Sequence, residues 1–257
     1  MRQPKGKVLL VGAGPGAADL LTLRALRAIE HADVILFDAL ISAEIRALFP
    51  QAARAIEVGK RGHRPSTPQD FTNRLMARLA REGWRVVRLK GGDPSIFGRA
   101  GEERAFLENF GVEVEVIAGV TTASAAAAQF GFSLTERGVA RRVLFATGRT
   151  FLGANEDWRS AADAETTLCL YMGCADIAAI AQNLIDAGRD GATPALAAVD
   201  VERPGAQLIS TQLCDLAKAL DDLARDGPVF IAIGEACAAA LNAAPAALRR
   251  AQGHRLY

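Results

Sequence analysis

Short apolar segments alternate with longer segments of helical periodicity through the first half of the chain. The apolar segment at 7–11 is followed by leucines and an isoleucine at helical spacing from Leu20 to Ile29, which predicts a strand and then a helix with Asp19 as its N-cap. Strands that alternate with helices predict an α/β fold with a mostly parallel sheet covered on both faces. The strands predicted in this half are 7–11, 34–37, 55–58, 85–89 and 112–117, and the helices are 20–29, 45–48, 68–79 and 101–110.

The second half also contains strands and helices, but turn residues separate two of its strands. The turn signal at 203–205 precedes an apolar segment at 207–211 and predicts hairpin pairing, and therefore a mixed sheet. The domain boundary is expected near Ala118, which gives an N-terminal α/β domain of 1–118 and a C-terminal α/β domain of 119–257. The predicted strands are 142–147, 167–172, 195–199, 207–211 and 229–233, the helices are 119–130, 175–187 and 213–225, a long loop is expected at 148–162, and a helix and a basic tail follow from about 235.

Composition argues against several classes of function. The 257 residues carry 30 Lys and Arg against 29 Asp and Glu, and a net charge of +1 gives no general attraction for nucleic acid. Three widely separated histidines and four cysteines without a Cys-x-x-Cys pair predict no metal site, with the cysteines as reduced core residues. No apolar segment reaches the ~18 residues of a membrane helix and no signal-peptide pattern is present, so we expect no membrane association and a cytoplasmic protein.

The most informative local pattern is a strand that runs into a glycine corner and then into a helix. The apolar segment ends at Leu89 and Lys90, Gly91-Gly92-Asp93-Pro94 makes a sharp turn, and a helical pattern begins at Gly101. Open α/β sheets bind ligands at the carboxyl ends of their strands, and adjacent glycines let the backbone approach a ligand closely. The same residues are also compatible with an ordinary strand-to-helix turn.

A second glycine loop follows the first strand. Gly12-Ala13-Gly14-Pro15-Gly16-Ala17 fits the dinucleotide-binding pattern G-x-G-x-x-[GA] between a strand and a helix, which suggests an NAD(P)-dependent oxidoreductase. Pro15 removes a backbone donor that a pyrophosphate would use, and Asp38 lies further along than the ~20-residue spacing of a ribose-binding acid. NAD(P), another ligand and a structural turn therefore all stay open for this loop.

Charged residues follow several of the predicted strands. Asp38 and Lys60 each lie just past a strand end, where a carboxylate and an ammonium group could transfer protons or form a surface ion pair. Further cations share these loops, and guanidinium groups suit carboxylate ligands, so a small polycarboxylate substrate or plain solvated charge would explain them. The cations are Lys60, Arg61, His63, Arg64, Lys90 and Arg99 in the first half, and Arg137, Arg141, Arg142 and Arg149 in the second.

Taken together, these motifs resemble those of the uroporphyrinogen-III C-methyltransferase family, a branch of the tetrapyrrole (precorrin) methyltransferases that use S-adenosylmethionine. The resemblance extends over nearly the whole chain to about residue 235. Several motifs in register make it far more specific than any one of them. The matching segments are 11–16, 19–22, 38–42, 58–61, 68–69, 89–94, 97–99, 101–103, 119–121, 147–148, 171–173 and 233–235.

The resemblance implies two α/β domains with the cofactor in the cleft between them, and a homodimer. It implies two successive methyl transfers from S-adenosylmethionine to carbons 2 and 7 of uroporphyrinogen III. The products would be S-adenosylhomocysteine and precorrin-2, a precursor of sirohaem, cobalamin or haem d1. No metal is required by this chemistry.

The resemblance also assigns site residues. Asp38 would be the proton acceptor and Lys60 the proton donor, and Arg99 would reach toward the methyl acceptor. The substrate carboxylates would be bound by Arg61, Arg64, Arg137 and Arg149. The cofactor would contact Pro15, Gly91, Gly92, Asp93, Ile96, Thr121, Thr122, Met172, Val201 and Ile233.

Several residues depart from the usual family pattern. Ser95 replaces a common phenylalanine, Ala100 a common glycine, and both Glu136 and Arg149 a usual histidine. The segment 200–202 also differs. These departures fall mainly on the tetrapyrrole side, so a methyltransferase acting on another precorrin stays open as an alternative, as does a non-catalytic binding protein.

Overall fold

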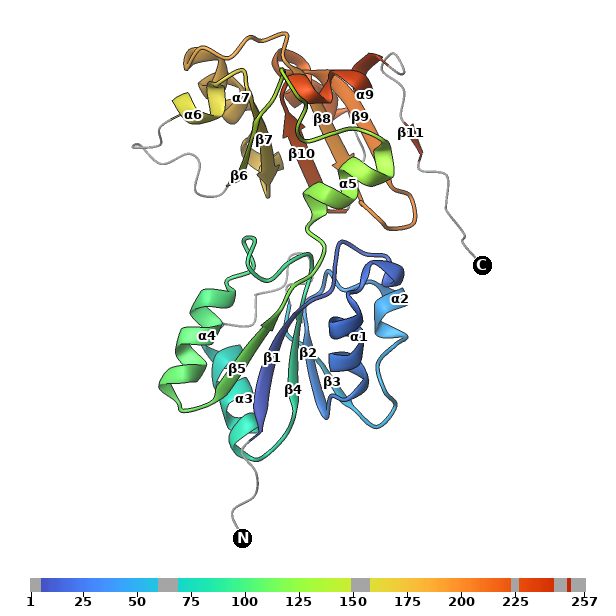
Figure 1. The fold of residues 1–257 in the computed structure, drawn as a ribbon, viewed down its shortest axis with the longest axis vertical. Helices are drawn as coiled ribbons and strands as arrows, with labels where there is room; N and C mark the ends of the chain where they lie inside the picture. The colour runs from blue at the N-terminus through green and yellow to red at the C-terminus, as the bar shows by residue number, and fades with distance from the viewer. Residues whose placement is uncertain (1–5, 60–68, 149–157, 223–226, 243–248, 251–257) are drawn as a thin grey trace. The chain divides into compact units, whose positions relative to one another are not determined.

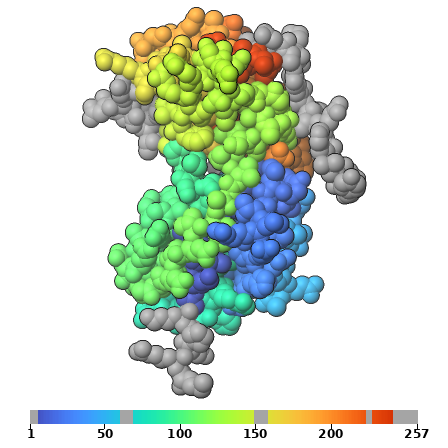
Figure 2. All heavy atoms as spheres, in the orientation of Figure 1, coloured from blue at the N-terminus to red at the C-terminus, as the bar shows by residue number. Residues whose placement is uncertain are grey.

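The computed structural model describes residues 6–59, 69–148, 158–222, 227–242 and 249–250. The chain divides into two compact units, Met1–Thr121 and Thr122–Tyr257, whereas the sequence pattern placed the boundary after Ala118. Each unit is an α/β structure with its own sheet, which confirms the predicted fold class (Figure 1). The space-filling view in Figure 2 shows that side chains fill the gaps between the ribbons of each unit.

Unit 1 contains a five-stranded sheet whose paired strands are all parallel, as predicted. The strand order is β3-β2-β4-β1-β5, so β4 lies at the centre between β2 and β1. The strands are β1 (Lys7–Gly12), β2 (Val34–Phe37), β3 (Arg54–Glu57), β4 (Val86–Lys90) and β5 (Glu113–Ile117), and the helices are α1 (Leu23–Glu30), α2 (Ala43–Arg46), α3 (Gln69–Arg81) and α4 (Ala100–Asn109), with a 3-10 turn η1 (Ala18–Leu20).

Two apolar cores cover the two faces of this sheet. The first packs side chains such as Ile35 and Leu89 against α1 and α2, and the second packs Val86 against Met76 of α3 and Leu107 of α4 (Figure 1). Successive side chains of a strand point to opposite faces, so residues 86, 88 and 90 of β4 all point toward α3 and α4. Two of these three positions, 88 and 90, carry a charge and therefore need charged or polar partners on this face.

Unit 2 contains a six-stranded mixed sheet in the order β11-β9-β8-β10-β7-β6. Among the strands that the structure describes in this unit, only β6 and β7 pair in parallel, and the pairing of β8 with β9 confirms the predicted hairpin. The core between the sheet and helices α7 and α8 contains Leu168, Ile180 and Ile231. The strands are β6 (Arg142–Thr147), β7 (Thr166–Tyr171), β8 (Pro194–Val199), β9 (Gln207–Gln212), β10 (Val229–Ile233) and β11 (Arg249–Arg250), the helices are α5 (Thr122–Phe130), α6 (Arg159–Ala162), α7 (Ile177–Asp186), α8 (Leu216–Asp221) and α9 (Ala238–Asn242), and the 3-10 turns are η2 (Cys174–Asp176), η3 (Leu213–Asp215) and η4 (Glu235–Cys237).

Three predictions about local structure were wrong. The N-cap of α1 is Thr22, whose hydroxyl accepts a hydrogen bond from Ala25 N at 3.1 Å, and the predicted cap Asp19 lies instead in the 3-10 turn before it. The end of the predicted loop 148–162 forms α6, because Ala161 and Ala162 pack into unit 2. The predicted basic tail includes β11, which pairs with β9.

The cysteines are all free, and only part of the prediction about them holds. Cys169 and Cys237 are buried, and burial raises the pKa of Cys169 and raises that of Cys237 to about 12, so both are unreactive core thiols. Cys214 is exposed rather than in the core. Within the described ranges, no cluster of His, Cys, Asp or Glu could hold a metal ion, and no helix has the length and apolar character needed to cross a membrane.

Candidate active site

Three glycine loops meet at the carboxyl ends of β1, β4 and β5. A Cβ atom on Gly12 would lie 2.6 Å from Gly119 Cα, and one on Gly119 would lie 2.3 Å from the carbonyl oxygen of Gly92. The backbones of Gly14 and Gly92 exchange two hydrogen bonds, at 3.2 and 2.7 Å. Only glycine allows the backbones to approach this closely, so these residues build a fixed floor beside the strand ends.

The Asp93 carboxylate binds the loops of unit 1 together. Its Oδ1 accepts a hydrogen bond from Ser95 N at 2.7 Å, and its Oδ2 accepts one from Gly119 N at 2.9 Å. Both oxygens of this predicted cofactor residue therefore have partners within the protein. Ser95 is exposed and does not line the neighbouring pocket, so its substitution for phenylalanine leaves the pocket wall to Ile96 and Phe97.

The Gly12 loop lacks the features of a dinucleotide site. Ala13 N donates to Lys90 O at 2.8 Å and Gly14 N to Gly92 O, so both N–H groups are occupied within the protein. Helix α1 begins only at Leu23, after an intervening 3-10 turn, so its N-terminus does not open directly at the loop as a pyrophosphate site requires. The geometry thus argues against the NAD(P)-dependent alternative.

A pocket of about 280 Å³ lies at the carboxyl ends of β2, β3 and β4. It brings together four residues that the sequence analysis proposed for the site, namely Asp38, Gly91, Ile96 and Arg99. Phe97 and Arg99 adopt positive φ values of 52° and 58°, which non-glycine residues rarely adopt and which often mark functional loops. The other lining residues are Leu40, Val58, Gly59, Gln69, Thr72, Arg88, Lys90, Phe97 and Gly98.

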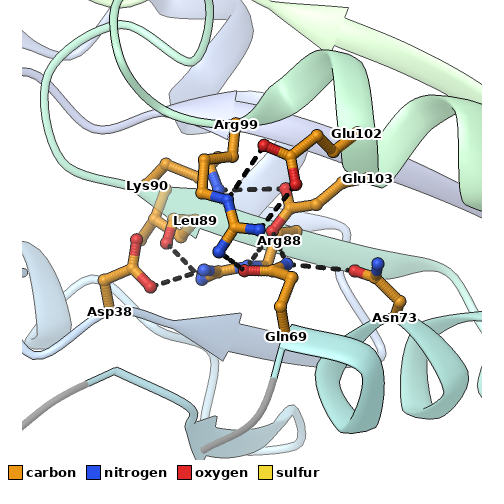
Figure 3. A network of polar contacts seen from close by, with 9 residues as sticks. All are labelled: Asp38, Gln69, Asn73, Arg88, Leu89, Lys90, Arg99, Glu102 and Glu103. Atoms are coloured by element: carbon orange, nitrogen blue, oxygen red, sulfur yellow. Dashed lines mark hydrogen bonds and ion pairs between the residues drawn. The ribbon is translucent and has the colours of Figure 1, made fainter. Parts of the chain in front are cut away.

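A network of buried charges lies under this pocket, on the face of β4 that points toward α3 and α4 (Figure 3). Arg88 is 5% exposed, Lys90 4% and Glu103 0%. Arg88 Nε donates to Glu103 Oε1 at 3.2 Å, and Lys90 Nζ donates to Glu103 Oε2 at 2.9 Å. Arg88 Nη2 donates to Asp38 Oδ1 at 2.5 Å. Buried charges are tolerated when they are paired and hydrogen-bonded, as all of these are.

Lys90 lies at the carboxyl end of β4, as predicted, but it is buried and paired rather than exposed on a loop. Its ammonium group points toward Glu103 of α4 because residues 86, 88 and 90 share the face of β4 that α3 and α4 cover. Burial lowers the pKa of Lys90, and the nearby charge of Arg88 acts in the same direction, against the opposing effects of Glu103 and Asp38.

Gln69 connects this network to the exposed Arg99. Gln69 Nε2 donates to Glu103 Oε1 at 2.9 Å, and Gln69 Oε1 accepts a hydrogen bond from Arg99 Nη1 at 3.2 Å (Figure 3). Arg99 also pairs with Glu102, and this hydrogen bond raises the pKa of Arg99 and lowers that of Glu102. An exposed ion pair of this kind is weak, so Arg99 can exchange Glu102 for another carboxylate.

The sequence analysis missed Arg88, Glu103 and Gln69. Two cations spaced two residues apart in an apolar central strand point to the same face and need buried partners, which is a signal for Arg88 and Lys90. Glu103 shares its helical face with the buried Ala100 and Leu107, so the phase of α4 identifies it as a buried acid. Gln69 and Glu103 both lie in segments that match the family, 68–69 and 101–103, but the match assigned a role to neither.

In unit 2, the predicted cofactor residues do not all lie at the same end of the sheet. Met172 follows β7 with φ 53° and 46% exposure, and Val201 follows β8 in a turn where Asp200 and Glu202 also have positive φ values. Strands β7 and β8 both run antiparallel to β10. Met172 and Val201 therefore lie at one end of the strands, and Ile233 lies toward the opposite end. Ile233 is also a core side chain, 1% exposed, so its assignment to the same cofactor site was wrong.

The remaining predicted residues are placed as follows. Pro15 is buried in the Gly12 loop, and Thr121 and Thr122 are half-buried at the junction between β5 and α5. Val201 is 3% exposed, so a ligand would meet its backbone rather than its side chain. Arg137 is exposed in the turn closed by Glu136 and Ala140. Lys60, Arg61, Arg64 and Arg149 lie outside the described residues.

Comparison with known proteins identifies the family. The model of the tetrapyrrole (corrin/porphyrin) methylases matches residues 7–217. The chain belongs to the tetrapyrrole methylase family. This confirms the resemblance inferred from the motifs.

Individual relatives of the methylase agree with the family match. This chain is 45% identical over 231 residues to a uroporphyrinogen-III C-methyltransferase of Pseudomonas aeruginosa, and the match covers 90% of this chain and 94% of the relative. It is 44% identical to a siroheme synthase of Neisseria meningitidis, over 90% of this chain but 47% of that protein.

Solved structures give the same result. A uroporphyrin-III C-methyl transferase of Thermus thermophilus in complex with S-adenyl homocysteine superposes with a TM-score of 0.78 at 37% identity, over 91% of the methylase and 100% of that chain. A cobalt precorrin-4 methyltransferase superposes with a TM-score of 0.80 at 28% identity, over 90% of the methylase and 95% of that chain.

The pocket of the methylase contains bare backbone and apolar surface of the kind that S-adenosylmethionine needs. Gly91 exposes bare backbone in the pocket wall, where an added Cβ would point toward Leu40 at 3.7 Å. Leu40, Ile96 and Phe97 add apolar surface nearby. A cofactor without phosphate groups needs such backbone and apolar contacts rather than a phosphate-binding loop.

Proposed function

We propose that this tetrapyrrole methylase transfers methyl groups from S-adenosylmethionine to carbons 2 and 7 of uroporphyrinogen III, releasing S-adenosylhomocysteine and precorrin-2. The observation that carries the proposal is the pocket of unit 1, where Asp38 and Arg99 lie beside the bare backbone of Gly91. The proposal is supported by the relative from Pseudomonas aeruginosa, which is named uroporphyrinogen-III C-methyltransferase and is matched over 94% of its length.

The chemistry requires positioning and one proton acceptor. S-adenosylmethionine, when bound, supplies a methyl group already activated by a sulfonium, so the protein mainly aligns it with the nucleophilic ring carbon. The new carbon–carbon bond forms as the sulfur–carbon bond breaks, and the macrocycle then loses a proton. We assign that proton to Asp38, whose side chain is 28% exposed and lines the pocket.

Local cations must bind the eight carboxylates of the substrate, because the chain has a net charge of only +1. Among the described residues of unit 1, Arg99 is the candidate, since its side chain is 53% exposed and lines the pocket. A guanidinium suits bidentate binding of a carboxylate. In the proposal, Arg137 and the predicted residues Arg61, Arg64 and Arg149 bind further carboxylates.

Other predicted roles remain part of the proposal. Lys60 acts as the proton donor. The cofactor contacts Pro15, Gly91, Gly92, Ile96, Thr121, Thr122, Met172 and the backbone of Val201, while Asp93 holds the loop that presents Gly91 and Gly92. We also propose that the protein works as a cytoplasmic homodimer, which light scattering of the purified protein and cell fractionation would test.

The decisive experiment is an anaerobic assay with uroporphyrinogen III and S-adenosylmethionine labelled in its methyl group. Two labelled methyl groups in precorrin-2 are expected. Asp38→Asn should lower turnover by about 10²–10⁴-fold, the usual contribution of a general base, while calorimetry shows unchanged binding of S-adenosylhomocysteine. The control Asp186→Asn changes an exposed acid on α7 and should retain full activity. Absence of labelled product from the unaltered protein would reject the substrate assignment.

A second candidate function is methylation of another precorrin. It is favoured by the exposed Glu136 beside Arg137, where the family usually has a histidine, and by the likeness to a cobalt precorrin-4 methyltransferase. Comparing turnover on uroporphyrinogen III with that on later precorrin intermediates separates the two. Faster transfer to a later intermediate would favour the second candidate.

A further inference from the structure

We propose that Arg88 is a positioning residue for Asp38, and that Glu103 and Lys90 hold Arg88 in the orientation which this task requires. The inference rests on the proposed function of Asp38 as the proton acceptor. It adds a buried support for which no role was predicted from the sequence, and in which Arg88 acts through Asp38 rather than on the substrate.

Every nitrogen of the Arg88 guanidinium has a partner (Figure 3). Nη2 donates to Asp38 Oδ1 at 2.5 Å, Nε to Glu103 Oε1 at 3.2 Å and Nη1 to Leu89 O at 3.2 Å. Leu89 O also accepts a hydrogen bond from Asp38 N at 3.3 Å. The planar group is thus fixed at three points, and the same carbonyl fixes the backbone of the residue that it positions.

Arg88 leaves one oxygen of Asp38 for the pocket. The contact is made to Oδ1 only, and among the residues that the structure describes, no other side chain donates to Asp38. A carboxylate that is held through one oxygen, with the other directed at bound substrate, is oriented for proton transfer. Arg88 itself is 5% exposed and each of its guanidinium nitrogens already has a partner in the protein, so it is less suited than Arg99 to binding a substrate carboxylate.

Glu103 and Lys90 complete the support. Glu103 is fully buried, binds Arg88 through one oxygen and Lys90 through the other, and also accepts a hydrogen bond from Gln69. With Asp38, the group contains two positive and two negative charges. Stability alone does not account for such a cluster in an apolar core, because buried ion pairs can often be replaced by apolar side chains without loss. Fixing Asp38 does account for it.

The test measures kcat and KM for methyl transfer in Arg88→Met, Arg88→Lys and Asp38→Asn, and in the double variant Asp38→Asn with Arg88→Met. Arg88→Met should lower kcat by about 10²-fold, within the range for a misplaced general base, with little change in KM. Arg88→Lys keeps the positive charge but not the planar guanidinium, so its kcat should lie between those of Arg88→Met and the unaltered protein. The double variant should be no slower than Asp38→Asn alone, because Arg88 acts through Asp38.

Two controls separate positioning from general damage. Arg189→Met removes an equally buried arginine in unit 2, whose Nη1 donates to the carbonyl oxygens of Ala161, Asp163 and Thr166, and should lower the melting temperature but not kcat of the folded protein. Binding of S-adenosylhomocysteine reports folding in each variant. If Arg88→Met does not fold, Arg88→Lys alone decides.

Three results would overturn the inference. They are unchanged kcat in Arg88→Lys and Arg88→Met, a rise in KM at constant kcat, and a further loss when Arg88→Met is added to Asp38→Asn. Failure of the proposed function is distinct, since it would appear as absence of methyl transfer by the unaltered protein or as full activity of Asp38→Asn.

Discussion

Two arginine–aspartate pairs join the same two strands, one at their amino ends and one toward their carboxyl ends, and they differ in how many hydrogen bonds the arginine gives the carboxylate. At the amino ends of β2 and β4, Arg85 donates to Asp33 through its backbone N, Nε and Nη2, at 2.8, 3.1 and 3.0 Å. At the carboxyl ends, Arg88 gives Asp38 a single donor. Between them lies the ladder that pairs Val34 with Val86 and Phe37 with Leu89.

The two arginines also differ in how deeply they are buried. The side chains of Arg85 and Asp33 are 56% and 30% exposed, whereas that of Arg88 is 6% exposed and is supported by Glu103. In the amino-end pair, Arg85 therefore binds both carboxylate oxygens of Asp33 at the surface. In the carboxyl-end pair, Arg88 binds one oxygen of Asp38, and Asp38 lines a pocket. In a parallel sheet, ligands bind at the carboxyl ends of the strands, so equivalent residue types acquire different roles through their position alone.

The largest expected effect on stability comes from Glu103. Glu103→Leu leaves Arg88 and Lys90 without their shared carboxylate, and removing one partner of a buried ion pair costs about 3–5 kcal/mol. Urea unfolding should show this loss. The control Glu108→Leu removes an exposed partner of Arg104 on the same helix and should change stability far less. Equal losses in the two variants would show that the buried cluster has no special structural role.

Much of unit 1 could be predicted from the sequence because its strands are nearly continuous apolar segments. The pattern predicted a strand at 34–37, the same bounds as β2 has in the structure, and it predicted the glycine corner at the carboxyl end of β4. It could not assign Glu102 and Glu103 to different environments without the phase of α4, which exposes the first and buries the second. Neighbouring identical residues can therefore have unrelated functions.

Unit 2 shows what a resemblance between motifs does not determine. The resemblance assigns Met172, Val201 and Ile233 to one cofactor site. Strand β10 runs antiparallel to β7 and β8, so Ile233 lies toward the opposite end of the strands from Met172 and Val201. Strand direction depends on the route of the connections, which periodicity does not report.

Arg99 gives the next largest effect, on substrate binding at the carboxyl end. Arg99→Ala removes an exposed guanidinium that in the proposal binds a substrate carboxylate, so KM for the tetrapyrrole should rise about tenfold, equivalent to ~1.4 kcal/mol. Glu102→Gln frees Arg99 from its ion pair and should leave KM unchanged or lower. Steady-state kinetics at fixed cofactor concentration measure both. A fall in kcat at constant KM in Arg99→Ala would instead place this side chain in the chemical step.

The smallest expected effect is that of Asp33→Asn at the amino end, and its dependence on pH tests whether this pair is purely structural. The hydrogen bond from Arg85 holds the pKa of Asp33 below its ordinary value of 3.8. A depressed pKa in the folded state means that the stabilising contribution is present above pH 3.8 and is lost as the pH falls through the lower, folded-state pKa. Thermal unfolding should therefore show a slightly lower melting temperature for Asp33→Asn at pH 7, a difference that shrinks as the pH is lowered below 3.8, and unchanged methyl transfer. A difference that persists unchanged at the lowest pH would mean that the carboxylate charge of Asp33 does not stabilise the fold, and a loss of turnover would remove the contrast between the two ends of the sheet.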